Sequence, residues 1–561
     1  MNRIRAVKTA WTLTEIATTP ADTGRQFLSN MRTTPSLLTR RMFARKTALA
    51  GAALASGALT ALGAEASDKP IESTKPPGAV VGPELRFEKT DLEALHGTAF
   101  KNALHNLLVT NTLPDTKKQY QRTGLFADPP GRFIRAGGSY ATPWTRDASI
   151  NAWNAASLLT PAVARNTLWA VCERQSNGRL IIQRDNQWWD KAIWAQGAWH
   201  HFLVTGDREF LARAYEAVRE SLAEMRRTRF NTQFGLFEGP SVLCDGIAGY
   251  PEPPYDPKVS SSFILDYPGG DKLLCLSTNC VYYQAYRCSA WMAGQLGKPA
   301  AEVAPFDKTA SQLRKATNRH LWMPAKSTYG YFIHGTGPLA GKLDESQEGM
   351  GLAYAILFDV ADAAQVRSIL RTVHIQPKGI VCVWPHFARF SDARPGRHNV
   401  VVWPMASGMW AHATAKAGAV EHFASEMTNS ASMANASQGI FYEIYHSVTG
   451  VPDGGWQVGR QWDSCIHQTW SATGYLRMVF HGLLGLNFET DGVRLTPTLP
   501  PGWGTVRLNG LRYRQAVLNL RLEGEGQQIA SVMVDGKPVP SAFISAKLTG
   551  EHQVTILLKP A

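Results

Sequence analysis

The hydrophobic pattern divides the chain into a long helical part and a shorter, strand-rich part. From about residue 91 to 485, apolar residues recur at the three- and four-residue spacing of amphipathic helices. The predicted helices span residues 148–159, 189–204, 208–227, 279–296, 306–321, 347–357, 363–373, 403–417 and 469–483. Because these segments follow one another in pairs, the pattern predicts a mainly α body built of helical hairpins.

After Gly485 the period changes, and apolar and polar residues alternate as they do in strands with one buried face. Four such stretches begin near Gly492, Leu511, Ile529 and Val554, with turn residues between them. We therefore predict a small antiparallel, β-sandwich-like domain over residues 486–561, following a helical catalytic domain over residues 91–485.

Two connections inside the helical part are unusually long. Residues 234–271 and 387–402 are rich in glycine, proline and aromatic residues, and they exceed the usual length of a connection in a compact domain. Long loops on a rigid scaffold often carry function, so we expect them at one end of the helical body.

The N-terminal region has the features of an export signal. Arg40 and Arg41 form a twin-arginine pattern, an apolar Ala/Leu/Gly stretch covers residues 47–63, and Ala64-Glu65-Ala66 suits a signal peptidase. Residues 1–66 are therefore predicted to be a signal peptide, and the polar Pro/Gly-rich residues 67–90 a linker. The prediction is a periplasmic or secreted protein that has no membrane contact after cleavage.

Composition and charge narrow the class of ligand. The net charge is +13, but residues 1–66 contribute nine basic and three acidic residues, +6, which leaves +7 for the rest. No basic run interleaved with aromatics follows, so nucleic acid is not an expected partner. The 17 tryptophans supply flat apolar faces of the kind on which sugar rings stack, although large proteins also use tryptophan in their cores.

The seven cysteines are most simply interpreted as buried free thiols, because they are few for a chain of this size. They show no metal-ligand spacing with histidine. We expect no metal and no cofactor, and the sequence predicts no oligomeric state.

The first candidate site segment follows a glycine-rich loop and enters a predicted helix. Trp144, Arg146 and Asp147 together offer an aromatic platform and hydrogen bonds to vicinal hydroxyls. Asp147 also stands where an acidic residue would cap a helix, which is the alternative interpretation.

A second segment places amides and acids around an aromatic pair. Gln187, Trp188 and Trp189 form a plausible sugar floor. The alternative is a helix start with both tryptophans in the core and Asp190 as a surface charge.

Acidic residues in two loops are the candidates for acid–base chemistry. Glu238 and Asp245 lie in the Gly/Pro-rich loop, where an aspartate before glycine is also a common turn former. Glu443 lies among tyrosines and precedes a segment containing Trp470, and Asp463 is a second choice to Glu443. The acids of residues 343–349 either line the pocket or cap the following helix.

These motifs resemble those of six-hairpin glycosidases, whose fold is an (α/α)6 toroid. The W-x-R-D segment is similar to that of glucoamylase-like enzymes, and the segment around Glu443 to the base-bearing segment of glycoside hydrolase family 63 and its relatives. The place of Asp245 resembles that of the acid in trehalase-like enzymes. Residues 398–404, which include Asn399 and Trp403, resemble the N-G-x-x-W-P start of a helix, with Val400 in place of the usual glycine.

The resemblance implies a function and a role for each residue. Arg146 and Asp147 would hold the terminal sugar, with Trp144 flanking it. Asp245 would be the general acid, with Glu238 as the alternative, and Glu443 the general base. An exo-acting, inverting hydrolase would then need its two carboxyl groups about 6.5–9.5 Å apart with a water between them.

Three alternatives use the same scaffold. A glycoside phosphorylase would gather cationic residues near Glu443, and a polysaccharide lyase would use a tyrosine and a histidine. A non-catalytic glycan-binding protein would keep the tryptophans without the acid–base pair. In each case the expected partner is a carbohydrate.

Overall fold

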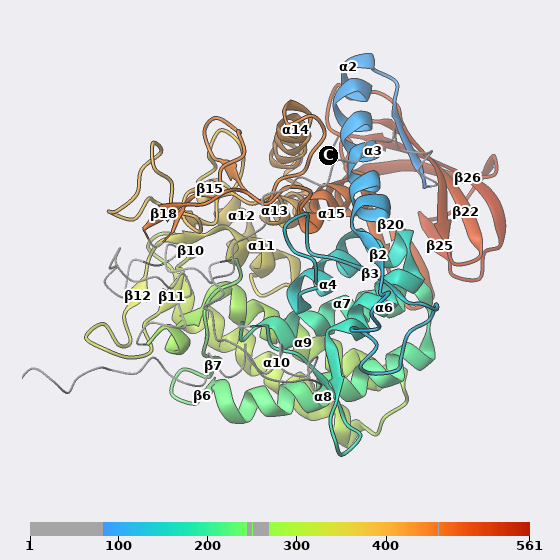
Figure 1. The fold of residues 1–561 in the computed structure, drawn as a ribbon. Coiled ribbons are helices and arrows are strands. Elements are labelled where there is room, and N and C mark those ends of the chain that lie inside the picture. The colour runs from blue at the N-terminus through green and yellow to red at the C-terminus, as the bar shows by residue number, and fades with distance from the viewer. Residues whose placement is uncertain (1–81, 186, 244–249, 251–268, 458, 561) are drawn as a thin grey trace, which may run out of the picture. The chain divides into compact units, whose positions relative to one another are not determined.

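The computed structural model of the protein describes residues 82–560, apart from 186, 244–249, 251–268 and 458 (Figure 1). These residues belong to one compact unit that spans residues 77–561. Helices make up most of the unit before residue 485, and strands make up most of it afterwards, as the hydrophobic pattern predicts.

Six largely buried helices, which alternate along the chain with more exposed ones, form the interior of the helical part. They are α4 (Thr145–Asn151), α7 (Asp190–Thr205), α9 (Leu276–Gln295), α11 (Gly349–Leu357), α13 (Pro404–Lys416) and α15 (Thr469–Arg477). Each contacts the next in this order, and α15 contacts α4, so the six form a closed ring. Small residues allow close approach: a Cβ on Gly408 of α13 would lie 2.6 Å from the carbonyl oxygen of Gly474 in α15.

A second set of helices covers the ring. It contains α3 (Thr98–His105), α6 (Pro161–Ala170), α8 (Arg208–Arg229), α10 (Ala300–Leu321), α12 (Ala363–Thr372) and α14 (Val420–Ala436). Local sequence sets their ends, as the Asp207 side chain accepts a hydrogen bond from the Phe210 N–H and begins α8. The nine predicted helices are confirmed, whereas α3, α6 and α14 were not predicted.

Shorter helical segments extend these elements. The chain continues from α4 through η3 (Ala152–Ala156) into α5 (Ser157–Leu159), and from α15 into η7 (Met478–Leu483). The remaining segments are α2 (Thr90–Leu92), η1 (Glu93–Gly97), η2 (Asn106–Thr110) and η6 (Gly270–Lys272).

Short strands between the helices shape the loops. They pair as β2 (Thr112–Pro114) with β3 (Arg132–Ile134), β4 (Cys172–Arg174) with β5 (Leu180–Ile182), β6 (Phe230–Asn231) with β7 (Leu236–Phe237), β9 (Trp322–Met323) with β10 (Thr328–Tyr329), β13 (Gln347–Glu348) with β14 (Val383–Trp384), β15 (Val401–Val402) with β16 (Tyr445–His446) and β17 (Trp456–Gln457) with β18 (Arg460–Gln461). A three-stranded sheet has the order β12 (Leu343–Asp344), β11 (Phe332–Ile333), β8 (Leu274–Cys275).

The C-terminal part contains two sheets. The larger has the order β1 (Glu84–Phe87), β21 (Val506–Tyr513), β22 (Ala516–Gly524), β26 (Gly550–Lys559), β23 (Gln528–Val534), β24 (Lys537–Pro538). The smaller has the order β19 (Leu486–Phe488), β20 (Gly492–Leu495), β25 (Phe543–Ser545). Figure 1 shows the blue N-terminal strand beside the red C-terminal strands.

This region differs from the sequence predictions in three respects. Residues 84–87 lie in the predicted linker 67–90 but form a strand, because Leu85 and Phe87 alternate with exposed residues and are buried. The predicted strand from Leu511 is instead a hairpin that turns at Arg514, whose φ is 51°. The larger sheet is mixed rather than antiparallel, because β22 and β26 run parallel.

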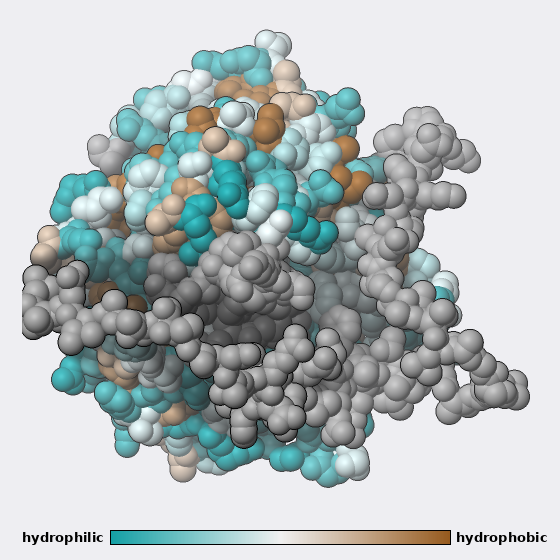
Figure 2. Space-filling model, turned by 60° about the vertical axis from the view of Figure 1, so that its left-hand side comes forward, coloured by the Kyte–Doolittle hydropathy of each residue, from teal (hydrophilic) through white to brown (hydrophobic). Residues whose placement is uncertain are grey.

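The surface of the described residues is mainly polar. On the face shown in Figure 2, hydrophobic residues lie scattered among hydrophilic ones. Within the described part of the chain, no helix combines the length and the apolar character that crossing a membrane requires. The six described cysteines are buried and free.

Candidate active site

Several of the candidate residues lie where ring helices begin. Trp144 precedes α4, Trp189 precedes α7, Glu348 precedes α11, Trp403 precedes α13 and Gln468 precedes α15. Side-chain contacts between these helix starts bring them to one end of the ring. Helix N-termini carry unpaired backbone N–H groups and a partial positive charge, so this end suits oxygen-rich ligands and carboxylates.

Glu443 lies in the loop between α14 and α15 and is 4% exposed. Arg397 Nη2 donates to Glu443 Oε2 at 2.7 Å, and the Tyr140 hydroxyl donates to Oε1 at 3.4 Å. The pairing of β15 with β16 brings the segment of Arg397 beside that of Glu443. The charge of Glu443 raises the pKa of Tyr140, and burial adds to the rise, so Tyr140 stays a neutral hydrogen-bond donor. Glu443 is thus an oriented carboxylate with a buried cationic partner.

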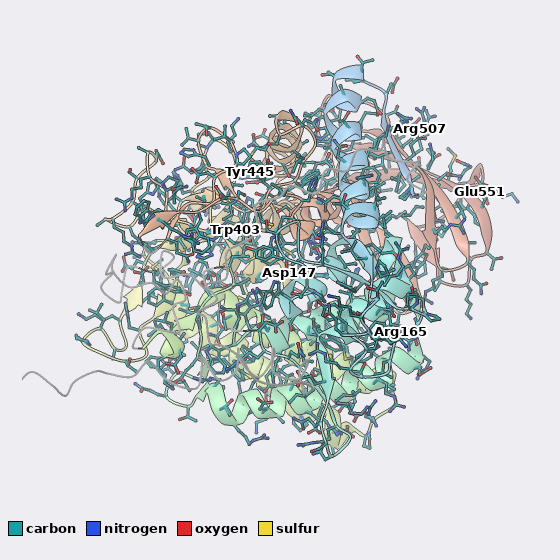
Figure 3. All side chains as sticks on the ribbon, viewed as in Figure 1. Asp147, Arg165, Trp403, Tyr445, Arg507 and Glu551 are labelled. Carbon is teal, nitrogen blue, oxygen red and sulfur yellow. The ribbon has the colours of Figure 1, made fainter. Side chains whose placement is uncertain are left out.

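Asp147 lies in the first turn of α4 and is 2% exposed, and Figure 3 shows it among the helices. Among the described residues it accepts no hydrogen bond, and its Oδ1 atom is sealed from solvent. Burial raises the pKa of Asp147 to about 7; Arg146 opposes this rise, and the negative charges of Glu443 and Asp190 add to it. It therefore does not cap its own helix, and it lies within electrostatic reach of Glu443.

Asp190 was expected, in the alternative interpretation of its segment, to be a surface charge, but it is fully buried at the first residue of α7. Its Oδ2 atom accepts the backbone N–H groups of Asp185 at 2.7 Å and Gln187 at 3.2 Å. Arg146 Nη1 lies 3.6 Å from Oδ1, yet burial outweighs this contact and raises the pKa of Asp190 to about 7. The tryptophans around Asp190 in the sequence are the signal that could have indicated its burial.

Asp185 connects the first two ring helices. Its Oδ2 atom accepts the backbone N–H and the hydroxyl of Thr145, both at 2.7 Å, and its carbonyl accepts Arg146 Nη1 at 3.1 Å. Asp185 therefore caps α4 from the loop before α7 and orients Arg146. No sequence pattern identified this role, because 40 residues separate the partners.

The predicted tryptophans have three different environments. Trp403 and Trp470 are buried and pack edge to face with ring centroids 5.8 Å apart, and Trp144 is half-buried with the Arg146 guanidinium 5.6 Å from its centroid. Trp189 is 1% exposed and belongs to the core. Trp403 and Trp470, at 3% and 4% exposed, belong to the same core cluster, so Trp144 is the member of this set that remains suited to a sugar.

Trp188 is not the open sugar floor that the sequence suggested. The guanidinium carbons of Arg184 and Arg229 lie 3.6 and 3.2 Å from its ring centroid. Two guanidinium groups cannot share one face at these distances, so they cover opposite faces of the indole. The two cations enclose the Trp188 indole. It therefore positions the loop before α7 instead of contacting a sugar.

Several buried polar atoms at the same helix starts have no hydrogen-bond partner among the described residues. They are Oδ1 of Asp147 and Asp190, the side-chain amide of Gln187, Nε1 of Trp188, Trp189 and Trp470, and Oε1 of Glu348 and Gln468. Buried polar atoms in native proteins are nearly always paired. This concentration of donors and acceptors at one end of the ring is suited to a ligand that carries many hydroxyl groups.

Glu348 is a further buried carboxyl that sequence analysis did not distinguish from helix-capping acids. It is 1% exposed, its Oε2 accepts the Ser277 backbone N–H at 3.0 Å, and burial raises its pKa to about 8. It links the starts of α9 and α11. Its neighbours in the 343–349 segment, Asp344 and Glu345, are more exposed.

The remaining predicted acids are placed less favourably or lie elsewhere. Both oxygens of Glu238 have partners: Lys272 Nζ at 2.9 Å and Asn231 Nδ2 at 3.0 Å. Asp463 is exposed, and Asp245 lies outside the described residues.

Asn399 has a structural position. Its Oδ1 accepts the Phe387 N–H at 3.0 Å, and its Nδ2 donates to the Pro385 carbonyl at 3.3 Å. It therefore clamps the 387–402 loop next to Trp403. Within the described part of the chain, no group of three or more His, Cys, Asp or Glu side chains is placed to hold a metal ion.

Comparison with solved structures shows relatives of the fold. A structure titled "Sialidase" matches with a TM-score of 0.60 and 15% identity, over 82% of this chain and 40% of that one. A GH78 family rhamnosidase of Bacillus sp. GL1 matches with a TM-score of 0.48 and 15% identity, over 86% and 44%. A GH63 mannosylglycerate hydrolase from Thermus thermophilus matches with a TM-score of 0.47 and 14% identity, over 65% and 100%. The chain thus spans less than half the length of the first two.

Sequence comparison identifies the family. No curated protein sequence matches the chain. The family model of the mannosylglycerate hydrolase MGH1-like glycoside hydrolase domain matches residues 140–471, more than half of the chain, and this range includes both Tyr140 and Trp470. The match confirms the family resemblance inferred from the motifs. The chain belongs to the family of MGH1-like glycoside hydrolase domains.

Proposed function

We propose that the protein is an exo-acting, inverting glycoside hydrolase that releases a terminal sugar from an oligosaccharide or glycoside. The observation that carries the proposal is the pair of buried carboxylates, Glu443 in the loop before α15 and Asp147 in the first turn of α4. One is held by Arg397 and Tyr140, and the other has no protein partner among the described residues. Glu443 is therefore suited to act as the general base, and Asp147 is suited to accept a hydrogen bond from a sugar hydroxyl.

In the proposed reaction Glu443 removes a proton from a water molecule that attacks the anomeric carbon. Arg397 keeps this carboxylate oriented through Oε2, and Oε1, which accepts the Tyr140 hydroxyl at 3.4 Å, has a second lone pair for the water. Asp245 donates a proton to the departing glycosidic oxygen, so that the bond to the leaving group breaks as the bond to water forms. Both roles rest on the family's motifs.

Arg146, Asp147 and Trp144 bind the terminal sugar in this proposal. A sugar hydroxyl can donate to the unpaired Asp147 carboxylate and accept from the Arg146 guanidinium, while Trp144 contacts its C–H face. Burial of Asp147 excludes water that would compete for these hydrogen bonds. The hydroxyl would also supply the partner that Asp147 lacks.

We further propose that the ring and its covering helices form an (α/α)6 toroid over residues 91–485, followed by a β domain over residues 486–561. The closed contact order of the six ring helices supports the toroid. The β1 strand joins the C-terminal sheet, so the β domain also draws on residues 84–87.

The export prediction remains a proposal on the sequence alone. Arg40, Arg41 and the apolar stretch that follows support a twin-arginine signal peptide over residues 1–66 and a periplasmic or secreted location. Fractionation of cells that express the full chain, with Arg40 and Arg41 both changed to lysine as the control, tests it. Export that continues unchanged in the double-lysine variant contradicts it.

The function is tested by incubating the purified protein with α- and β-linked oligosaccharides and following the product anomer by NMR. We expect release of a terminal sugar with inversion, and loss of activity in Glu443→Gln and in Asp245→Asn. Asp463→Asn, an exposed acid on the loop that contacts Glu443, is the matched control and should retain activity.

The same experiment separates the alternatives. Cleavage that requires inorganic phosphate indicates a phosphorylase, and activity that persists in Glu443→Gln indicates a lyase. Binding without turnover indicates a glycan-binding protein. Retention of the anomeric configuration contradicts the proposed mechanism.

A further inference from the structure

A cavity of about 610 Å³ lies at the opposite end of two ring helices from the candidate active site. Its walls come from the C-terminal parts of α7 and α9, from α10, and from the turn that follows β19. Because an α-helix rises about 1.5 Å per residue, the end of α9 lies about 28 Å along its axis from its start. The cavity is therefore separate from the residues at the helix starts.

Two tryptophans form its aromatic wall. Trp199 of α7 and Trp291 of α9 both line the cavity, with ring centroids 5.7 Å apart and planes inclined by 35°. Trp199 is 7% exposed and Trp291 is partly exposed, and each ring carries an indole N–H that can donate to a ligand. The wall thus combines apolar ring surface with donors that a ligand can use.

Gly294 keeps the space beside this wall open. It lies in the last turn of α9, and a Cβ placed on it would meet no atom within 4 Å. Its φ is not in the left-handed region, so the backbone does not require glycine here. Glycine in a helix costs about 1 kcal/mol relative to alanine. The residue therefore lowers helix stability and leaves the cavity unfilled.

The polar groups of the cavity are hydrogen-bond acceptors and hydroxyls rather than cations. The carboxyl groups of Asp307 and Glu489 and the hydroxyl of Thr490 line it, and no lysine, arginine or histidine does. Arg494 pairs with Glu489 at 2.8 Å and satisfies one of these acids, while Asp307 is exposed. An anionic ligand would meet the like charge of Asp307, whereas the hydroxyl groups of a neutral ligand can donate to this carboxylate.

We propose that this cavity is a second, non-catalytic binding site for a neutral oligosaccharide. Sugar C–H faces would lie against Trp199 and Trp291, and hydroxyls would donate to Asp307. The volume lies within the range of pockets that hold ligands of this size. The inference rests on the proposed function only in taking a carbohydrate as the protein's ligand class. Such a site would raise the affinity for long chains by holding a second part of the same glycan.

The test measures binding of cellopentaose, maltopentaose, mannopentaose and xylopentaose to the full chain by calorimetry and tryptophan fluorescence. The Gly294→Leu variant fills the cavity without a backbone clash, and Ala301→Leu adds the same side chain at an exposed site on α10. We expect Gly294→Leu to weaken one binding event at least about tenfold, with its Tm equal to or above that of the wild type. The Ala301→Leu control should bind as the wild type does.

A second variant tests the proposed binding site without adding a side chain to the cavity. Asp307→Asn removes the charge of an exposed rim acceptor without changing its size, and it should weaken the same binding event. Equal binding in Gly294→Leu and Ala301→Leu overturns the proposal, and so does a wild type that binds none of the four neutral probes. Tighter binding of trigalacturonate than of the neutral probes also overturns it.

The outcomes separate this proposal from the proposed function. Hydrolysis of short substrates should be unchanged in Gly294→Leu, because the residue is remote from the helix starts. Loss of oligosaccharide binding in Gly294→Leu while the wild type hydrolyses nothing supports the cavity and contradicts the hydrolase. If Gly294→Leu binds oligosaccharides as the wild type does and the wild type hydrolyses its substrates, the hydrolase is supported and the cavity site is contradicted.

Discussion

Asp147→Asn should stabilise the protein while it removes activity, because the native state buries this carboxyl without a partner. Burial raises its pKa from the ordinary 3.8 to about 7, so the folded protein holds the proton more tightly than the unfolded chain. The free energy of unfolding therefore depends on pH with the opposite sign to that produced by an ion-paired aspartate. The stabilising contribution of Asp147 is greatest below pH 4 and is lost as the pH rises towards 7. At about 1.4 kcal/mol per pH unit, the loss is about 2 kcal/mol at pH 5 and about 4 kcal/mol at pH 7.

An asparagine of the same shape does not ionise, so the advantage of Asp147→Asn over the wild type should grow by about 2 kcal/mol between pH 5 and pH 7. The measurement is urea unfolding followed by tryptophan fluorescence at pH 5, 6 and 7. Asp91→Asn, at an exposed position, is the control and should show no such growth. Activity in Asp147→Asn should fall at least about 100-fold, since a sugar-binding carboxylate is lost. A stability difference that does not change with pH refutes the reasoning.

Three further predictions concern ion pairs and helix packing. Arg397→Ala leaves the buried carboxylate of Glu443 without its cation and should lower the free energy of unfolding by about 3–5 kcal/mol. In denaturant titrations, the double variant with Glu443→Gln should recover part of this loss. If the effects of the two single variants simply add, the pairing is contradicted. Glu238→Gln should keep kcat/KM within about threefold, because Lys272 pairs with this acid on the outer part of its loop; a loss of about 100-fold or more would instead make it the proton donor. Gly408→Ala should lower the free energy of unfolding by about 1–3 kcal/mol, since its Cβ would meet the α15 backbone, and an unchanged Tm would show that the ring can widen there.

Helix positions were well predicted where apolar residues repeat on one face. The predicted helix 208–227 corresponds to α8 (Arg208–Arg229), which has a buried face and an exposed face. The ring helix α7 was predicted as well, from the same helical spacing of apolar residues, although the structure buries it almost all round. The missed helix α14 has many small polar residues, so its buried face gives little periodic signal.

The site was predicted unevenly for a related reason. Motifs identified Glu443, Asp147 and Trp403 because their neighbours in the sequence are unusual. Arg397 was not predicted to contact Glu443, since 46 residues separate them and only the β15–β16 pairing brings them together. Trp188 was misinterpreted because the two arginines that cover it come partly from α8, outside its motif.

The amino-acid order alone determined which segments are helices and strands, which residues carry ionisable and aromatic groups, and which family the motifs resemble. These properties are local, because periodicity and residue type act over a few neighbouring positions. The tertiary structure decided which carboxyl groups have partners and which are left without one. Asp147 and Asp190 differ from Glu238 in burial and in contacts rather than in chemistry. Burial and pairing depend on segments far apart in the chain, and these two quantities control the pKa of a carboxyl group and its availability to a ligand.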